Sequence, residues 1–175
     1  MRELLIANRE AQHPEAKAAL TACGLGLRGG PVWGVGCVTV QGEFYTPALP
    51  HETGAPAVIV SAFENGSIID LVATGLHSRK SKTRRGVATC LGADHIERAR
   101  WNKTKVRLHA DPLMWLCAGA TGAVIIDLTA AWSLLADTAG IVCGNDDALA
   151  ERIHQAMAKP FVIPPIYVWE GRHET

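Results

Sequence analysis

The sequence has no apolar run long enough to cross a membrane as a helix. Its longest stretch without a charged residue extends from Pro112 to Ile126, 15 residues, whereas a spanning helix needs about 20. The early charges of Arg2 and Glu3 are atypical of a secretory signal. We therefore expect a cytoplasmic protein with no membrane partner.

Disulfide and zinc patterns are also missing. The five cysteines are Cys23, Cys37, Cys90, Cys117 and Cys143. Their odd number, their wide spacing and the lack of a Cys-x-x-Cys pair argue against a disulfide framework and against a zinc site. We predict reduced thiols in or near the core, where a free cysteine behaves as a small hydrophobic residue.

No motif identifies a catalytic nucleophile or a nucleotide-binding loop. Neither Gly-x-Ser-x-Gly nor Gly-x-x-x-x-Gly-Lys-Ser/Thr occurs, and no cysteine stands in a recognisable catalytic context. The glycines from Gly24 to Gly30 do not follow a predicted strand, so they are not a dinucleotide fingerprint. We assign no catalytic residue and no cofactor, and we expect a protein that is not an enzyme.

What the sequence does contain is a separation of charge. It has 17 Lys and Arg against 17 Asp and Glu, a formal net charge of zero. The 29 residues from Arg79 to Arg107, the basic segment, hold ten of the cations but only two acids, Asp94 and Glu97. The ten are Arg79, Lys80, Lys82, Arg84, Arg85, Arg98, Arg100, Lys103, Lys105 and Arg107. The basic segment thus carries +8 and the rest of the chain −8, which favours nucleic acid or another polyanion as partner.

Residue patterns predict an α+β fold in a single domain over residues 1–175. In the sub-region 1–86, mostly antiparallel β, we predict a helix over 14–23 and strands over 32–40, 43–46, 57–63 and 67–73. The pair Asn65-Gly66 between two β-rich runs predicts a tight hairpin.

The sub-region 87–169 alternates short apolar strands with helices. We predict strands over 106–109, 123–126 and 140–143, helices over 93–102, 111–118, 128–135 and 147–158, and extended segments over 161–163 and 166–169. This order is typical of a βαβαβα-like half with a parallel sheet. Residues 170–175 are expected to form a tail.

The basic segment predicts contacts with phosphate groups. His77 to Gly86 combines cations with hydroxyl residues and lacks apolar periodicity, so we expect a mobile loop that neutralises phosphates. Trp101 lies within the second group of cations, Arg98 to Arg107, and is placed to stack on an unpaired base. The alternative is a solvated loop whose charges pair with the acidic remainder. No recognition motif is visible, so sequence-specific readout is not predicted.

Acidic residues follow three predicted strands, where the carboxyl ends of a parallel sheet line one crevice. Asp127, Asp146 and Asp147 are candidate ligands for Mg²⁺, which prefers carboxylate and water oxygens. Helix capping is the alternative that we favour, because these residues and Asp111 stand at the starts of predicted helices.

Residues 42–86 resemble the region that precedes the Toprim domain in phage and plasmid primases. The stretch Glu-Phe-Tyr-Thr-Pro-Ala-Leu-Pro-His-Glu-Thr-Gly-Ala-Pro-Ala-Val-Ile-Val from Glu43, and Phe-Glu-Asn-Gly-Ser-Ile-Ile-Asp-Leu-Val from Phe63, precede a basic link as in that family. A Toprim domain has a strand ending in Glu-Gly and a later Asp-x-Asp pair that hold Mg²⁺. Here the strand ends at Asp127 without Glu-Gly, and the zinc-binding cysteines of full primases are missing. The resemblance therefore implies a nucleic-acid-associated relative without catalysis.

The leading hypothesis is a non-catalytic nucleic-acid-associated protein of mobile-element or replication context, binding the phosphate backbone through the ten cations and Trp101. One alternative is a Mg²⁺-dependent phosphoryl-transfer or nuclease-like enzyme that uses the three aspartates. Another is a protein–protein interaction module whose basic loop docks on an acidic partner.

Overall fold

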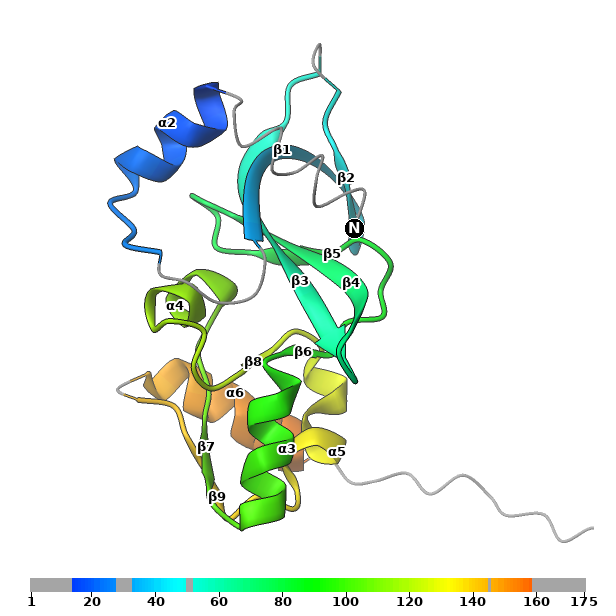
Figure 1. The fold of residues 1–175 in the computed structure, drawn as a ribbon, viewed down its shortest axis with the longest axis vertical. Coiled ribbons are helices and arrows are strands. Elements are labelled where there is room, and N and C mark those ends of the chain that lie inside the picture. The colour runs from blue at the N-terminus through cyan, green and yellow to red at the C-terminus, as the bar shows by residue number, and fades with distance from the viewer. Residues whose placement is uncertain (1–13, 28–32, 50–51, 145, 159–175) are drawn as a thin grey trace, which may run out of the picture.

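The computed structural model describes residues 14–27, 33–49, 52–144 and 146–158. Within them the predicted α+β composition is present, with a barrel toward one end and an α/β unit toward the other (Figure 1). Helix α2 (Pro14–Ala22) packs on the barrel. The predicted segments 161–163 and 166–169 and the tail 170–175 lie outside the described residues.

Five strands close into the barrel. They are β1 (Trp33–Gln41), β2 (Phe44–Pro47), β3 (Ala55–Glu64), β4 (Ser67–Gly75) and β5 (Ser81–Thr83). Their order is β1-β2-β5-β4-β3, with β3 pairing back to β1, and every pair is antiparallel except β2 with β5. Asn65 and Gly66 connect β3 to β4 with φ of 49° and 76°, the positive values that a type I′ turn requires.

The prediction of a mobile loop from His77 to Gly86 is wrong, because its centre is strand β5. That strand satisfies backbone groups of both β4 and β2, which would otherwise be open edges of the barrel. The backbone that follows β5 is held by the buried carboxylate of Asp70. This carboxylate accepts hydrogen bonds from the amides of Arg85 (2.9 Å), Val87 (2.8 Å) and Ala88 (3.1 Å). The first part of the basic segment is therefore part of the barrel.

The α/β unit combines helices with four very short strands. Its helices are α3 (Ala93–Asn102), α4 (Pro112–Cys117), the 3-10 turn η1 (Leu128–Ala130), α5 (Ala131–Leu135) and α6 (Asp147–Ala158). Its strands are β6 (Cys90–Leu91), β7 (Lys105–Arg107), β8 (Val124–Ile125) and β9 (Gly140–Val142). Strands β7 and β9 are parallel, and a parallel bridge joins Leu108 to Ala123. Strand β6 was not predicted, and its antiparallel pairing with β8 makes the arrangement mixed rather than fully parallel.

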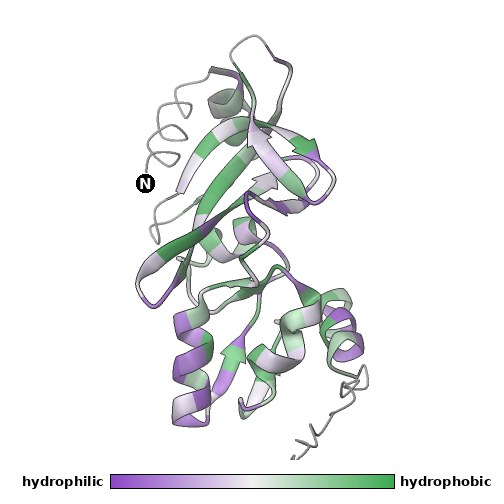
Figure 2. Cartoon of the chain, turned by 90° about the vertical axis from the view of Figure 1, so that its right-hand side faces the viewer, coloured by the Kyte–Doolittle hydropathy of each residue, from purple (hydrophilic) through white to green (hydrophobic). Residues whose placement is uncertain are grey.

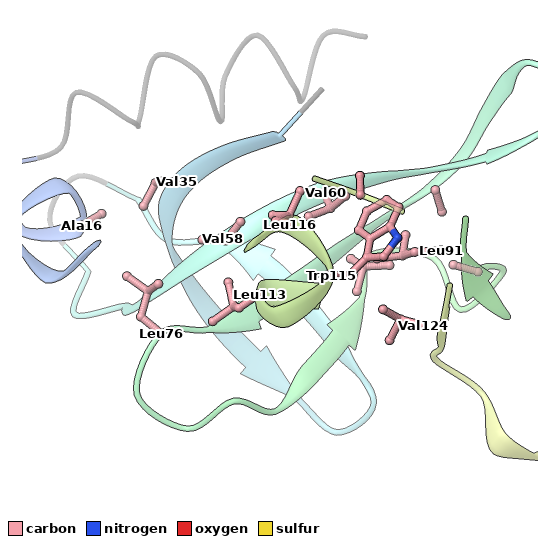
Figure 3. Close-up of a cluster of buried hydrophobic side chains, with 14 of the residues drawn as sticks. Ala16, Val35, Val58, Val60, Leu76, Leu91, Leu113, Trp115, Leu116 and Val124 are labelled. Atoms are coloured by element: carbon pink, nitrogen blue, oxygen red, sulfur yellow. The ribbon is translucent and has the colours of Figure 1, made fainter. Parts of the chain in front are cut away.

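Along β1, β3 and β4, much of both faces of the barrel wall is buried. Alternate residues fill the interior, namely Val38, Tyr45, Ala57, Ile59, Leu71 and Ala73. The opposite face of β1, β3 and β4 packs against α2 and α4, so that Val58 and Val60 share one cluster with Leu113 and Leu116 (Figure 3). A second cluster lies beneath α3, α5 and α6. Because α4 and β8 belong to the α/β unit, the first cluster crosses the junction between the two parts.

None of the described helices has the length and apolar character needed to span a bilayer. Helix α3 is mostly hydrophilic along its length (Figure 2), and only Ile96 and Ala99 are buried. It therefore rests on the α/β unit by a narrow apolar stripe and presents polar residues to solvent.

Candidate functional site

Four of the ten cations in the basic segment are bound within the protein. Arg79 donates to both carboxylate oxygens of Asp111, with Nε–Oδ2 at 3.0 Å and Nη2–Oδ1 at 3.1 Å. The remaining three contacts are Lys82 Nζ to Glu43 Oε2 (3.0 Å), Arg84 Nη1 to the Tyr45 carbonyl (3.1 Å) and Arg100 Nη2 to Asp137 Oδ2 (2.9 Å). The structure therefore shows ion pairs with the acidic remainder of the molecule for Arg79, Lys82 and Arg100.

The other six cations form a set that we call the unpaired cations. They are Lys80, Arg85, Arg98, Lys103, Lys105 and Arg107. Each is exposed, and in the described part of the chain none of these side chains makes a hydrogen bond or an ion pair. Four of the six lie on or beside α3 and β7. These side chains are available to an external anion without breaking an internal contact.

Trp101 is exposed in the middle of these cations. It lies near the end of α3, and 89% of its surface is accessible. A shallow hollow of about 300 Å³ beside it is lined by Glu97, Arg100, Lys103 and Asp137 as well as the indole. Most of this large apolar side chain therefore faces solvent.

A cavity of about 330 Å³ lies at the junction of the barrel and the α/β unit. The residues that line this junction cavity are Arg79, Lys80, Ser81, Lys82, Ala110, Val124, Ile125, Ile126 and Arg152. Four are cationic and none is acidic. Arg152 comes from α6, outside the basic segment, and sequence reasoning missed it because only the tertiary fold brings α6 beside β5 and β8.

Two of the three candidate Mg²⁺ ligands, Asp127 and Asp146, are engaged as helix caps. Asp127 Oδ1 accepts from Thr129 N (2.9 Å) and Thr129 Oγ1 (2.7 Å) at the start of η1. Asp146 Oδ1 accepts from Leu149 N (2.8 Å) at the start of α6, and Asp147 is exposed. Within residues 14–27, 33–49, 52–144 and 146–158, no three His, Cys, Asp or Glu side chains are grouped to hold a metal ion.

Asp111 is a cap with a second role. Its Oδ1 accepts from Leu113 N (2.8 Å) and Met114 N (2.9 Å), so the capping prediction is confirmed. The same carboxylate receives the bidentate contact from Arg79. Asp111 thus joins the barrel side of the basic segment to the first turn of α4.

All five cysteines are free, as predicted. Cys117 and Cys143 line a separate hollow of about 560 Å³ beside the ends of β7 and β9. Burial raises the pKa of the Cys143 thiol, and the nearby carboxylate of Asp146 raises it further. A raised pKa keeps the thiol protonated at neutral pH, whereas a nucleophilic cysteine needs the thiolate. The environment of Cys143 therefore disfavours the thiolate.

No protein-family model, no curated protein and no solved structure matches this chain.

Proposed function

We propose that this protein binds nucleic acid through the phosphate backbone, without sequence readout and without catalysis. The observation that carries the proposal is the set of six exposed, unpaired cations together with the 89% exposed indole of Trp101. The resemblance to the pre-Toprim region of primases supports a replication or mobile-element context.

The charge distribution favours phosphate contacts over internal pairing. A lysine or arginine that already has a carboxylate partner must exchange one ion pair for another, whereas an unpaired cation gains the phosphate and releases the phosphate's condensed counterion. Arg98, Lys103, Lys105 and Arg107 lie within ten residues of one another on α3, its C-terminal turn and β7. Four such contacts give a slope of log K against log salt of about −3 for a single strand.

A single strand fits this surface better than a duplex. Helix α3 carries Asp94 and Glu97 on its exposed surface, and these carboxylates would meet phosphates if the helix entered a major groove. Trp101 instead offers a stacking face, which is worth about 1–3 kcal/mol per base. Stacking and backbone contacts tolerate any sequence, in keeping with the lack of a recognition motif.

The test is binding of fluorescent single-stranded DNA and RNA across a salt series. The fourfold variant Arg98→Gln, Lys103→Gln, Lys105→Gln, Arg107→Gln should lose most of the affinity and flatten the salt slope. The matched control exchanges the same four residues between Lys and Arg, which keeps the charge and should keep the slope. Trp101→Ala should weaken binding about tenfold, and Trp132→Ala, which removes the 47% exposed indole of α5, should not. Lack of binding at low salt would overturn the proposal.

A further inference from the structure

The junction cavity is built from both parts of the molecule. Its barrel side is the chain from Arg79 to Lys82, which leads into β5, and its other side is β8 with Ala110. Arg152 of α6 completes the lining. The three β8-side residues Val124, Ile125 and Ile126 supply apolar surface, so the cations face a partly apolar wall rather than open solvent alone.

The charge of the cavity does not cancel. Arg79 is paired with Asp111 and Lys82 with Glu43, whereas Lys80 and Arg152 have no ion pair in the described chain. The lining residues and the two carboxylate partners together therefore leave a charge of +2. Like charges gathered in one cavity repel each other, and a bound anion removes that repulsion.

We propose that the junction cavity binds a phosphate monoester. A monoester carries about −1.5 to −2 charges at pH 7 and three strong acceptor oxygens, which matches the residual charge. A backbone diester carries only one charge and would leave the cavity unbalanced. Arg79 uses two of its five N–H donors on Asp111, so three remain for the phosphate oxygens. The site is separate from Trp101, and it does not require that a polynucleotide bind along α3 and β7.

Two sources supply this chemistry, the 5′-terminal phosphate of a strand and a small phosphorylated molecule. The experiment therefore has two arms. In one, the affinities of 5′-phosphorylated and 5′-hydroxyl oligonucleotides of the same sequence are compared. In the other, thermal unfolding is followed with adenosine 5′-monophosphate and with adenosine as the uncharged control.

The decisive variant is Lys80→Gln with Arg152→Gln, two exposed side chains whose loss should leave the fold intact. The control variant, Lys103→Gln with Lys105→Gln, removes two positive charges at positions outside the cavity. We expect the first variant to abolish any preference for the 5′-phosphate or the stabilisation by the monophosphate, an effect of tenfold or more in affinity. The second should weaken both oligonucleotides equally and leave the response to the monophosphate unchanged.

The outcomes separate this proposal from the proposed function. A preference for the 5′-phosphorylated strand that depends on Lys80 and Arg152 assigns the source as a strand end. Stabilisation by the monophosphate alone, with the same dependence, assigns it as a small molecule. If neither arm responds while salt-dependent binding persists, the cavity proposal is overturned and the proposed function stands. If the monophosphate binds but no oligonucleotide does, the reverse holds.

Discussion

Asp70 is a buried carboxylate in the middle of an apolar strand, only 2% exposed. Besides the amide of Leu71 (2.7 Å), it accepts three hydrogen bonds from the chain that follows β5. We expect Asp70→Ala to lower the free energy of unfolding by about 3 kcal/mol, because it leaves backbone amides in and near the core without an acceptor. Chemical denaturation measures this loss.

Asp127→Ala is the matched control for that change. Asp127 is also an aspartate that binds backbone amide, but it is exposed and caps only η1. Its loss should cost about 1 kcal/mol, the usual value for a cap. Equal losses at the two positions would show that the carboxylate of Asp70 does not hold the chain after β5.

Cys90 makes stability depend on pH in the alkaline range. Burial raises the pKa of its thiol to about 11, the hydrogen bond with Thr89 lowers it, and the carboxylates of Glu64, Glu97 and Asp94 raise it. The folded pKa lies above the unfolded one, so the folded state keeps a proton that the unfolded chain releases. The stabilisation is therefore complete below about pH 9 and declines toward pH 11, by about 1.4 kcal/mol per pH unit.

The measurement is the slope of unfolding free energy against pH for the wild-type protein and for Cys90→Ala. Other groups titrate in this range in both proteins, so the difference between the two slopes isolates the thiol. The alanine variant should have the shallower decline. Parallel curves would contradict the prediction.

Gly92 shows how closely the short elements of the α/β unit approach one another. It precedes α3 with φ of 74°, and a side-chain carbon there would collide with the backbone carbonyl oxygen of Gly122. We expect Gly92→Ala to destabilise the protein by about 3 kcal/mol, the sum of a left-handed backbone cost and overpacking. Denaturation curves provide the value.

Gly119→Ala separates those two contributions. Gly119 has a similar φ of 71°, but nothing lies within 4 Å of the added carbon. It should therefore cost only about 1 kcal/mol, from the backbone alone. A loss as large as that of Gly92→Ala would show that close approach to Gly122 is not what selects glycine at position 92.

The sequence predicts the elements whose signals are local. Helix α3 occupies 93–102 and α6 occupies 147–158, both as predicted. Strands β5 and β6 were missed because neither lies in an apolar run that signals a strand: β5 is the polar Ser81–Thr83 and β6 is only Cys90–Leu91, and both form by pairing with distant partners. Asp70 was the overlooked signal, since a carboxylate inside a buried strand requires donors from elsewhere.

The candidate site also has a part that local sequence predicts and a part that it does not. Trp101 and its cations were predicted as one group because they are close in sequence. Which cations remain unpaired, and that Arg152 joins Lys80, depends on contacts over tens of residues that composition does not encode. The loop prediction was wrong for a related reason. It rested on the polar side chains of the segment, whereas the backbone of the same segment pairs with β2 and β4.

In three dimensions the cations of the basic segment fall into two groups, one that makes internal contacts and one that stays exposed. Arg79, Lys82 and Arg84 attach the start of the basic segment to the barrel and to α4. The unpaired cations remain on the surface of both parts. A protein of zero net charge can therefore still present exposed cations, because some cations of the basic segment make internal contacts and the others face solvent.

The core that crosses the junction predicts that the barrel and the α/β unit unfold together. Leu116 of α4 is fully buried in the cluster that contains Val58 and Val60 of β3. Leu116→Ala should cost about 2–5 kcal/mol, since it removes buried methyl groups and leaves a cavity. If the two parts are one cooperative unit, that loss lowers the protection of slow-exchanging amides in β4 and in α6 by the same free energy.

Native-state hydrogen exchange of the full chain measures both amide sets in one experiment. Met114→Ala is the matched control, because Met114 lies on the same helix but is 49% exposed. It should change the protection of either set by less than about 1 kcal/mol. Loss of protection in β4 alone would mean that the barrel opens without the α/β unit. In that case the junction cavity, whose walls come from both parts, would exist only while the two remain docked.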